Sequence, residues 1–181
     1  LYESKYLPSL YRDKNRCYSI RVSDNYLGRI LLGLASSYKR MPSKGQSIKD
    51  YLKENQPSLD FIKNTDEKTR NWCVRLAFTT DGYISYSSKI HRLALSCYST
   101  ILCKQWLEVL DICGIKSFVG KSKNSWCGDA EVIISQRSIP LFWNIGGFIE
   151  GVKISNKSKK YKGWEKNKLL EKVLRERYGP V

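Results

Sequence analysis

The clearest hydrophobic pattern in the chain runs through residues 72–82. One apolar face has the i, i+3, i+4 spacing of an amphipathic helix and consists of Val74, Ala77 and Phe78. A second face carries medium-sized and small residues, which are Leu76, Thr79 and Thr80. Two such faces are typical of a helix that packs between two partners. The second face therefore predicts a helix interface.

Both ends of this helix carry recognisable signals. Asn64 or Thr65 is expected to cap the N-terminus. Gly82 is a stop signal, because glycine tolerates the left-handed conformation just past a helix end. Asp81 lies at the negative end of the helix dipole, which disfavours a carboxylate by about 0.3–1 kcal/mol. A bound cation would offset this cost. The alternative is that Asp81 only begins a turn.

The pattern beyond residue 82 alternates between short strands and helices. The predicted elements are strands at 83–87 and 90–96, a helix at 101–113, strands at 115–119 and 131–135, a short helix at 139–148 and a helix at 164–178. Hairpins placed between helices predict an α+β fold, in which an antiparallel sheet forms a saddle with helices packed on one face.

The first 60 residues are harder to interpret. Residues 1–17 show no clear period, residues 18–22 alternate as a strand does, and apolar positions at 27, 30, 31 and 34 predict a helix. A second, short helix is predicted at 48–54. Two interpretations stay open for residues 1–60, the end of a preceding half-domain or a helical lead-in. Residues 61–181 form the α+β unit with a basic C-terminal tail.

Alternation along the first hairpin separates two sheet faces. If Ile84, Leu93 and Leu95 point to the helices, the opposite face carries hydroxyl groups, a tyrosine and an arginine. These residues are Tyr83, Ser85, Ser87, Arg92 and Ser96. Such side chains suit phosphate and base-edge contacts in a major groove, which admits a two-stranded ribbon. The alternative is an ordinary solvated sheet face.

Charge favours the nucleic-acid interpretation. The chain has 32 Lys and Arg against 17 Asp and Glu, a formal net charge of +15, which indicates a polyanionic partner. Further candidate contacts to DNA are the lysines of the loops and the tail: Lys89, Lys121, Lys123, Lys157, Lys159, Lys160 and Lys162. An anionic membrane surface is the competing explanation.

Composition excludes other classes. Six cysteines without a Cys-x-x-Cys pair, together with a single histidine, argue against a zinc site of ordinary spacing. The cysteines are expected to be free thiols, and His91 a structural residue. No apolar run reaches the ~20 residues that span a bilayer, so we expect an intracellular protein without a membrane segment.

The segment Phe78-Thr79-Thr80-Asp81-Gly82 and the helix before it resemble the signature helix of the LAGLIDADG homing endonucleases. The order of elements after it resembles one unit of that family, so the resemblance covers roughly residues 60–178. It implies that Asp81 ligates a catalytic metal. The sequence departs from the family at Thr79, where an acid is common, and at Leu76, where a small residue lets two helices approach.

The resemblance implies a site-specific, metal-dependent endonuclease of double-stranded DNA. Mg²⁺ would be held between paired Asp81 residues with Gly82 beside them, and Mn²⁺ or Ca²⁺ would substitute in binding. Arg137 loosely matches a basic position near the scissile phosphates. The second signature helix would come from a homodimer or from a missing N-terminal half. Leu76 and Thr79 favour an alternative, a non-cleaving regulator or maturase that binds DNA or intron RNA.

Overall fold

The computed structural model describes residues 9–12, 18–21, 45, 47, 58–87, 91–97, 100–121, 130–154, 158 and 160–179, with residues 9–12, 18–21 and 121 described by their backbone. The helix predicted from positions 27, 30, 31 and 34 and the short helix predicted at 48–54 lie outside these residues. So do the candidate DNA contacts Lys89, Lys123, Lys157 and Lys159.

A four-stranded antiparallel sheet organises residues 58–179. Its strand order is β3-β4-β6-β5. The strands are β3 Gly82–Tyr86, β4 His91–Cys97, β5 Ser117–Lys121 and β6 Ala130–Ile134. All three pairings between neighbouring strands are antiparallel. The structure therefore confirms an α+β fold with an antiparallel sheet.

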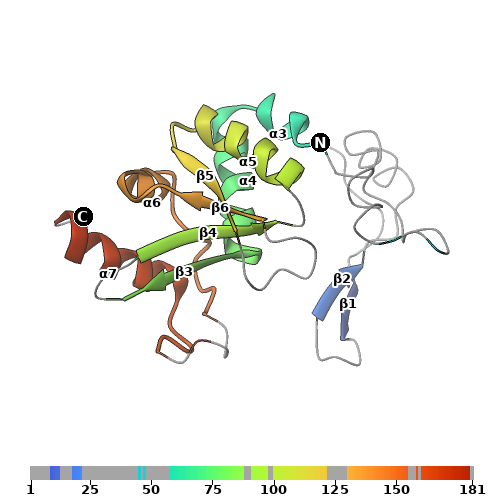
Figure 1. The fold of residues 1–181 in the computed structure, drawn as a ribbon. Coiled ribbons are helices and arrows are strands. Elements are labelled where there is room, and N and C mark those ends of the chain that lie inside the picture. Colours follow the sequence, from blue (N-terminus) through green and yellow to red (C-terminus); the bar gives the residue numbers. More distant parts are fainter. Residues whose placement is uncertain are drawn as a thin grey trace.

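Helices α4 (Glu67–Thr80) and α5 (Thr100–Ile112) lie together on one face of this sheet (Figure 1). Their apolar faces meet the inward residues of the central strands. The core of this layer contains Val74, Phe78, Leu93, Leu95, Val109, Leu110, Val132 and Ile134. The helix face predicted from the i, i+3, i+4 spacing is therefore the core face of α4.

Helices α6 and α7 close one end of the layer. The 3-10 turn η1 (Gln136–Ser138) leads into α6 (Ile139–Asn144), and α7 (Lys166–Tyr178) lies beside the edge strand β3 (Figure 1). Phe142 of α6 stacks against Phe78 of α4 with ring centroids 5.2 Å apart. From α4 to α6 the order is helix, strand, strand, helix, strand, strand, helix, as the sequence predicts.

The ends of α4 differ from the prediction. Asp66, not Asn64 or Thr65, caps the N-terminus, where its carboxylate accepts a hydrogen bond from Thr69 N at 3.0 Å. Gly82 is not in the left-handed region, so that expectation is wrong. Glycine is needed there for space, since a Cβ would lie 2.4 Å from the carbonyl oxygen of Phe78.

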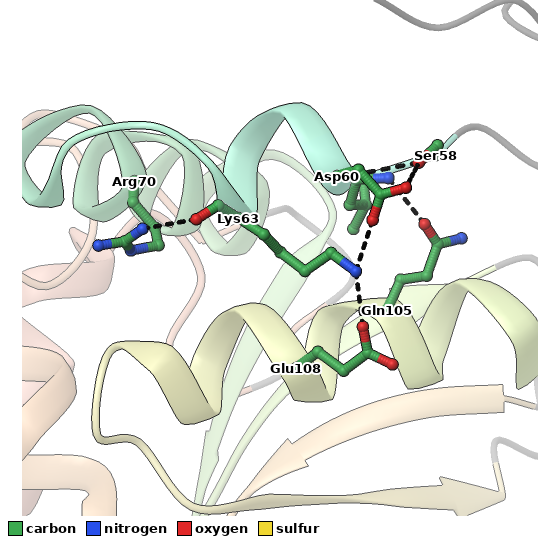
Figure 2. A network of polar contacts seen from close by, with 7 residues as sticks. Ser58, Asp60, Lys63, Arg70, Gln105 and Glu108 are labelled. Carbon is green, nitrogen blue, oxygen red and sulfur yellow. Dashed lines mark hydrogen bonds and ion pairs between the residues drawn. The ribbon is translucent and has the colours of Figure 1, made fainter.

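A short helix that the sequence did not predict, α3 (Asp60–Lys63), is anchored to α5 (Figure 2). Lys63 Nζ lies 2.6 Å from Asp60 and 2.7 Å from Glu108 of α5. The backbone N–H of Leu59 donates to Gln105 Oε1 at 2.7 Å. Polar contacts of the α+β unit thus extend back to Leu59.

Strands β1 (Ser9–Arg12) and β2 (Tyr18–Arg21) form a separate antiparallel hairpin. The predicted strand at 18–22 corresponds to β2. Strand β1 falls in a stretch where no hydrophobic period was visible. None of the described helices is both long and apolar enough to cross a membrane.

Candidate nucleic-acid interface and the end of helix α4

The sheet face opposite the helices carries the polar residues that the alternation predicts on β3 and β4, and we call it the polar face, although Ala94, Ile133 and the half-exposed Phe118 also lie on it. Ile84, Leu93 and Leu95 are buried toward the helices. On the opposite face the hydroxyl residues Ser85, Ser87 and Ser96 are exposed. Three of the predicted DNA contacts therefore lie on a surface that a ligand can reach.

The centre of this face holds a buried acid, Glu131 of β6, of which only 2% is exposed. Tyr83 OH donates to Glu131 Oε2 at 2.7 Å, and Arg92 Nη2 forms an ion pair with Glu131 Oε1. Both carboxylate oxygens are thus occupied by side chains from β3 and β4. A buried carboxylate is tolerated only when it is paired and hydrogen-bonded in this way.

Arg92 crosses the sheet to make this pair. In the β4–β6 register Ser96, not Arg92, stands opposite Glu131, so the arginine extends past Ala94, which is fully buried. Gly120 of β5 leaves room for it, since a Cβ there would lie 3.1 Å from Arg92 Nη2 and 2.3 Å from Ile133 Cδ1. The guanidinium therefore lies over the middle of the sheet.

The phenol of Tyr83 acts as a fixed donor in this cluster. Burial, together with the hydrogen bond to Glu131, raises the pKa of Tyr83 to about 12. The hydroxyl keeps its proton at neutral pH and donates to the carboxylate. Tyr83 and Arg92 lie on the predicted face, but their polar ends are engaged within the protein. Sequence reasoning missed Glu131, whose only signal was a lone acid in an otherwise apolar strand.

Asp81 follows the last turn of α4 and is exposed. Its backbone carbonyl accepts a hydrogen bond from Ser96 N at 3.2 Å, which places Asp81 next to the polar face. Thr80 Oγ1 lies 3.3 Å from Asp81 Oδ2. Among the described residues no cationic group forms an ion pair with this carboxylate, so it is available to a ligand.

A buried lysine supplies the positive charge that the end of α4 requires. Lys166 Nζ, from the first turn of α7, donates to the carbonyl oxygens of Thr79 and Gly82, each at 2.7 Å. A cation at this end of a helix is favourable. The carbonyl of Gly82 is therefore occupied by an ammonium group, which would repel a metal ion. This contact does not favour the metal-site role predicted for Gly82, which stays a prediction.

Replacing Lys166 by Met should give a pH-dependent loss of stability. At pH 7 we expect unpaired carbonyls to cost about 1–3 kcal/mol. Burial lowers the pKa of Lys166 from its ordinary 10.5, while Asp81 opposes this shift. Between the lowered pKa of the folded state and pH 10.5, the unfolded chain binds more protons than the folded chain. The free energy of unfolding of the wild type therefore rises with pH in this range. Denaturant titrations from pH 8 to 10.5 should show a widening gap between wild type and Lys166→Met.

The matched control for this titration is Lys168→Met, because Lys168 lies on the same helix with 69% of its side chain exposed. Its difference from wild type should stay flat over the same range. A flat difference for Lys166→Met would contradict the lowered pKa of Lys166.

Asp81 is the residue predicted to ligate a metal. No group of three or more His, Cys, Asp or Glu side chains among the described residues could hold a metal. Asp81 fits Mg²⁺ in its chemistry, since it is an exposed oxygen donor without a cationic partner. A complete site would need a second carboxylate from another unit.

Arg137 lies at the opposite end of the sheet from Asp81. Tyr178 OH bonds both His91 Nε2 at 3.0 Å and the carbonyl of Gln136 at 2.5 Å, so η1 lies beside His91. Asp81 pairs with Ser96, which is about 16 Å further along β4 at ~3.3 Å per residue. Arg137 is exposed, but the chain does not bring it and Asp81 into one site.

The predicted helix interface is only partly available. Leu76 is 52% exposed, and Thr80 is exposed too. Thr79 is 5% exposed and is engaged within the unit, where its hydroxyl donates to Arg75 O and accepts from Ile149 N. Trp72, one turn before Leu76 and 48% exposed, extends the surface instead. We call Trp72, Leu76 and Thr80 the exposed α4 face.

The thiol prediction is confirmed for the described cysteines, and the DNA contacts predicted for the lysines stay predictions. Lys160 and Lys162 are exposed in the loop before α7, and Lys121 is the last residue of β5. The described cysteines, Cys73, Cys97, Cys103 and Cys113, are free thiols. His91 is structural in its contacts, since it is buried and bonded to Tyr178.

No protein-family model matches the chain. Comparisons with curated proteins and with solved structures likewise found no match.

Proposed function

We propose that the chain binds duplex DNA through the polar face of its sheet. The observation that carries the proposal is the position of Asp81, which is exposed at the end of α4 and bonded through its backbone to Ser96 on that face. The net charge of +15 supports a polyanionic partner. A ribbon of two antiparallel strands fits the width of the major groove.

The proposal includes cleavage of the type that the LAGLIDADG resemblance implies. A bound Mg²⁺ would polarise the scissile phosphate and activate water. Asp81 would contribute one carboxylate ligand to it. Ser85 and Ser96, exposed on the polar face, would position the duplex by donating to phosphate oxygens.

A second unit would complete the site. The exposed α4 face, Trp72, Leu76 and Thr80, is the surface through which it would pair. The partner is a second copy of the chain or an N-terminal half that precedes this sequence. Because Leu76 is larger than the small residues that allow close helix approach, Trp72 and Leu76 would set a wider separation.

We expect binding to duplex DNA to fall steeply with salt. Each neutralised phosphate contributes about −0.9 to the slope of log K against log salt, so several contacts give a slope of several units. Fluorescence anisotropy of a labelled duplex between 50 and 300 mM KCl measures it, with anionic vesicles as the competing ligand. A flat slope, or a preference for the vesicles, would contradict the proposal.

One observation favours the non-cleaving alternative. Lys166 already supplies a cation to the carbonyls at the end of α4, so the helix end does not depend on a metal for its electrostatic balance. A regulator or maturase that binds DNA or intron RNA would use the same polar face and leave Asp81 as a turn residue. Nicking assays with Mg²⁺ and Mn²⁺ separate the two candidates.

A further inference from the structure

Arg92 differs from the described lysines Lys160 and Lys162, which are exposed, because it is paired with a buried carboxylate. Glu131 is 2% exposed, and its charge is compensated by Arg92. If the guanidinium turned away to a phosphate, it would leave a buried carboxylate uncompensated, which is strongly unfavourable. Arg92 therefore meets any ligand in the position that the protein gives it.

That position is defined from three strands. Tyr83 of β3 fixes Glu131 of β6 by a 2.7 Å hydrogen bond, and Gly120 of β5 leaves the space that the guanidinium enters. Arg92 Nε is buried without a hydrogen-bond partner among the described residues. The side chain is nevertheless 35% exposed. The Arg92 side chain is thus held rigidly and stays partly exposed on the sheet face opposite the helices, with Nε buried and Nη2 bound to Glu131.

We propose that Arg92, held by Glu131 and Tyr83, is a base-reading residue that recognises a guanine in the major groove. The inference rests on the proposed binding of duplex DNA. Guanine presents the O6 and N7 acceptors that match an arginine fork, and this is the commonest specific contact between proteins and DNA. Arginine donates five N–H groups, so the bond to Glu131 leaves others for a base.

The ion pair with Glu131 also predicts that Arg92 contributes little to general affinity for DNA. Its charge is cancelled by Glu131, so it adds little to the release of counterions from DNA. An exposed lysine such as Lys162 differs from Arg92, because its ammonium group is carried on a flexible side chain and has no fixed direction. Arg92 should therefore determine sequence preference, whereas Lys162 should determine general affinity.

The test starts with the wild-type chain and a pool of random-sequence duplex DNA, from which a preferred site is selected. Each guanine of that site is then replaced in turn by 7-deazaguanine, which pairs normally but lacks the N7 acceptor. We expect roughly a tenfold or greater loss of affinity at one position. Arg92→Lys and Glu131→Gln should lose the guanine preference at that position alone, and Tyr83→Phe should weaken it.

Lys162→Gln is the matched control, for which we expect an unchanged preference and a salt slope reduced by about one unit. The proposal is overturned if no 7-deazaguanine weakens wild-type binding, a result that needs no variant. It is also overturned if folded Arg92→Lys and Tyr83→Phe select the wild-type site unchanged, since the cluster would then be a structural clamp. If the wild type shows no salt-dependent DNA binding, the proposed function is wrong, and the inference about Arg92 is then wrong as well.

Discussion

Asp81→Asn is expected to abolish metal-dependent cleavage of duplex DNA while leaving DNA binding intact. The amide keeps the shape of the side chain and removes the charge that would hold Mg²⁺. A metal supplies several kcal/mol of transition-state stabilisation, so we expect at least about a 100-fold loss of the cleavage rate. Binding should be equal or tighter, because one negative charge near the phosphates is gone. Nicking of supercoiled plasmid and anisotropy on a labelled duplex measure the two effects.

Asp111→Asn is a suitable control for this experiment. Asp111 is an exposed aspartate of α5 whose carboxylate pairs with Lys116 at 2.5 Å, so it undergoes the same chemical change away from the end of α4. It should cleave as wild type does. If Asp81→Asn also cleaves as wild type, Asp81 is only a turn residue. If wild type binds DNA but never nicks it with Mg²⁺ or Mn²⁺, the non-cleaving alternative replaces the endonuclease.

Local periodicity was sufficient to predict the framework of the fold. Val74, Ala77 and Phe78 predicted the core face of α4, because that face repeats within a single helix. The inward positions Ile84, Leu93 and Leu95 followed from strict alternation in two paired strands. Patterns of this kind depend only on neighbours in sequence, and the four-residue helix α3 is too short to display a helical period.

The chemistry of the candidate site depends on contacts that no local pattern shows. Glu131 lies 39 residues from Arg92, and Lys166 lies 84 residues from Gly82. The sequence offered a bound cation as one way to offset the charge of Asp81 at the end of α4, with a turn residue as the alternative. It could not indicate that a lysine of α7 supplies a positive charge there. Likewise the alternation placed Arg92 on the polar face without revealing the acid that holds it.

Arg92→Leu is expected to destabilise the fold by about 3 kcal/mol. The substitution leaves the carboxylate of Glu131 buried and without its cation, and breaking a buried pair costs about 3–5 kcal/mol. The lower end applies because a third of the Arg92 side chain is exposed. Urea denaturation followed by circular dichroism at pH 7 gives the free energy of unfolding. Ser85→Ala, an exposed neighbour opposite Arg92 in the β3–β4 register, should change it by less than about 0.5 kcal/mol.

The double variant Arg92→Leu/Glu131→Leu decides whether the loss comes from the uncompensated charge. Replacing a buried ion pair by apolar residues of similar volume is often neutral or stabilising, so most of the 3 kcal/mol estimated for the single variant should be recovered. The recovery would identify desolvation of Glu131, and not lost packing of the arginine stem, as the origin of the effect. If the double variant is as unstable as the sum of the two single variants, the pair is not coupled and Glu131 does not need Arg92.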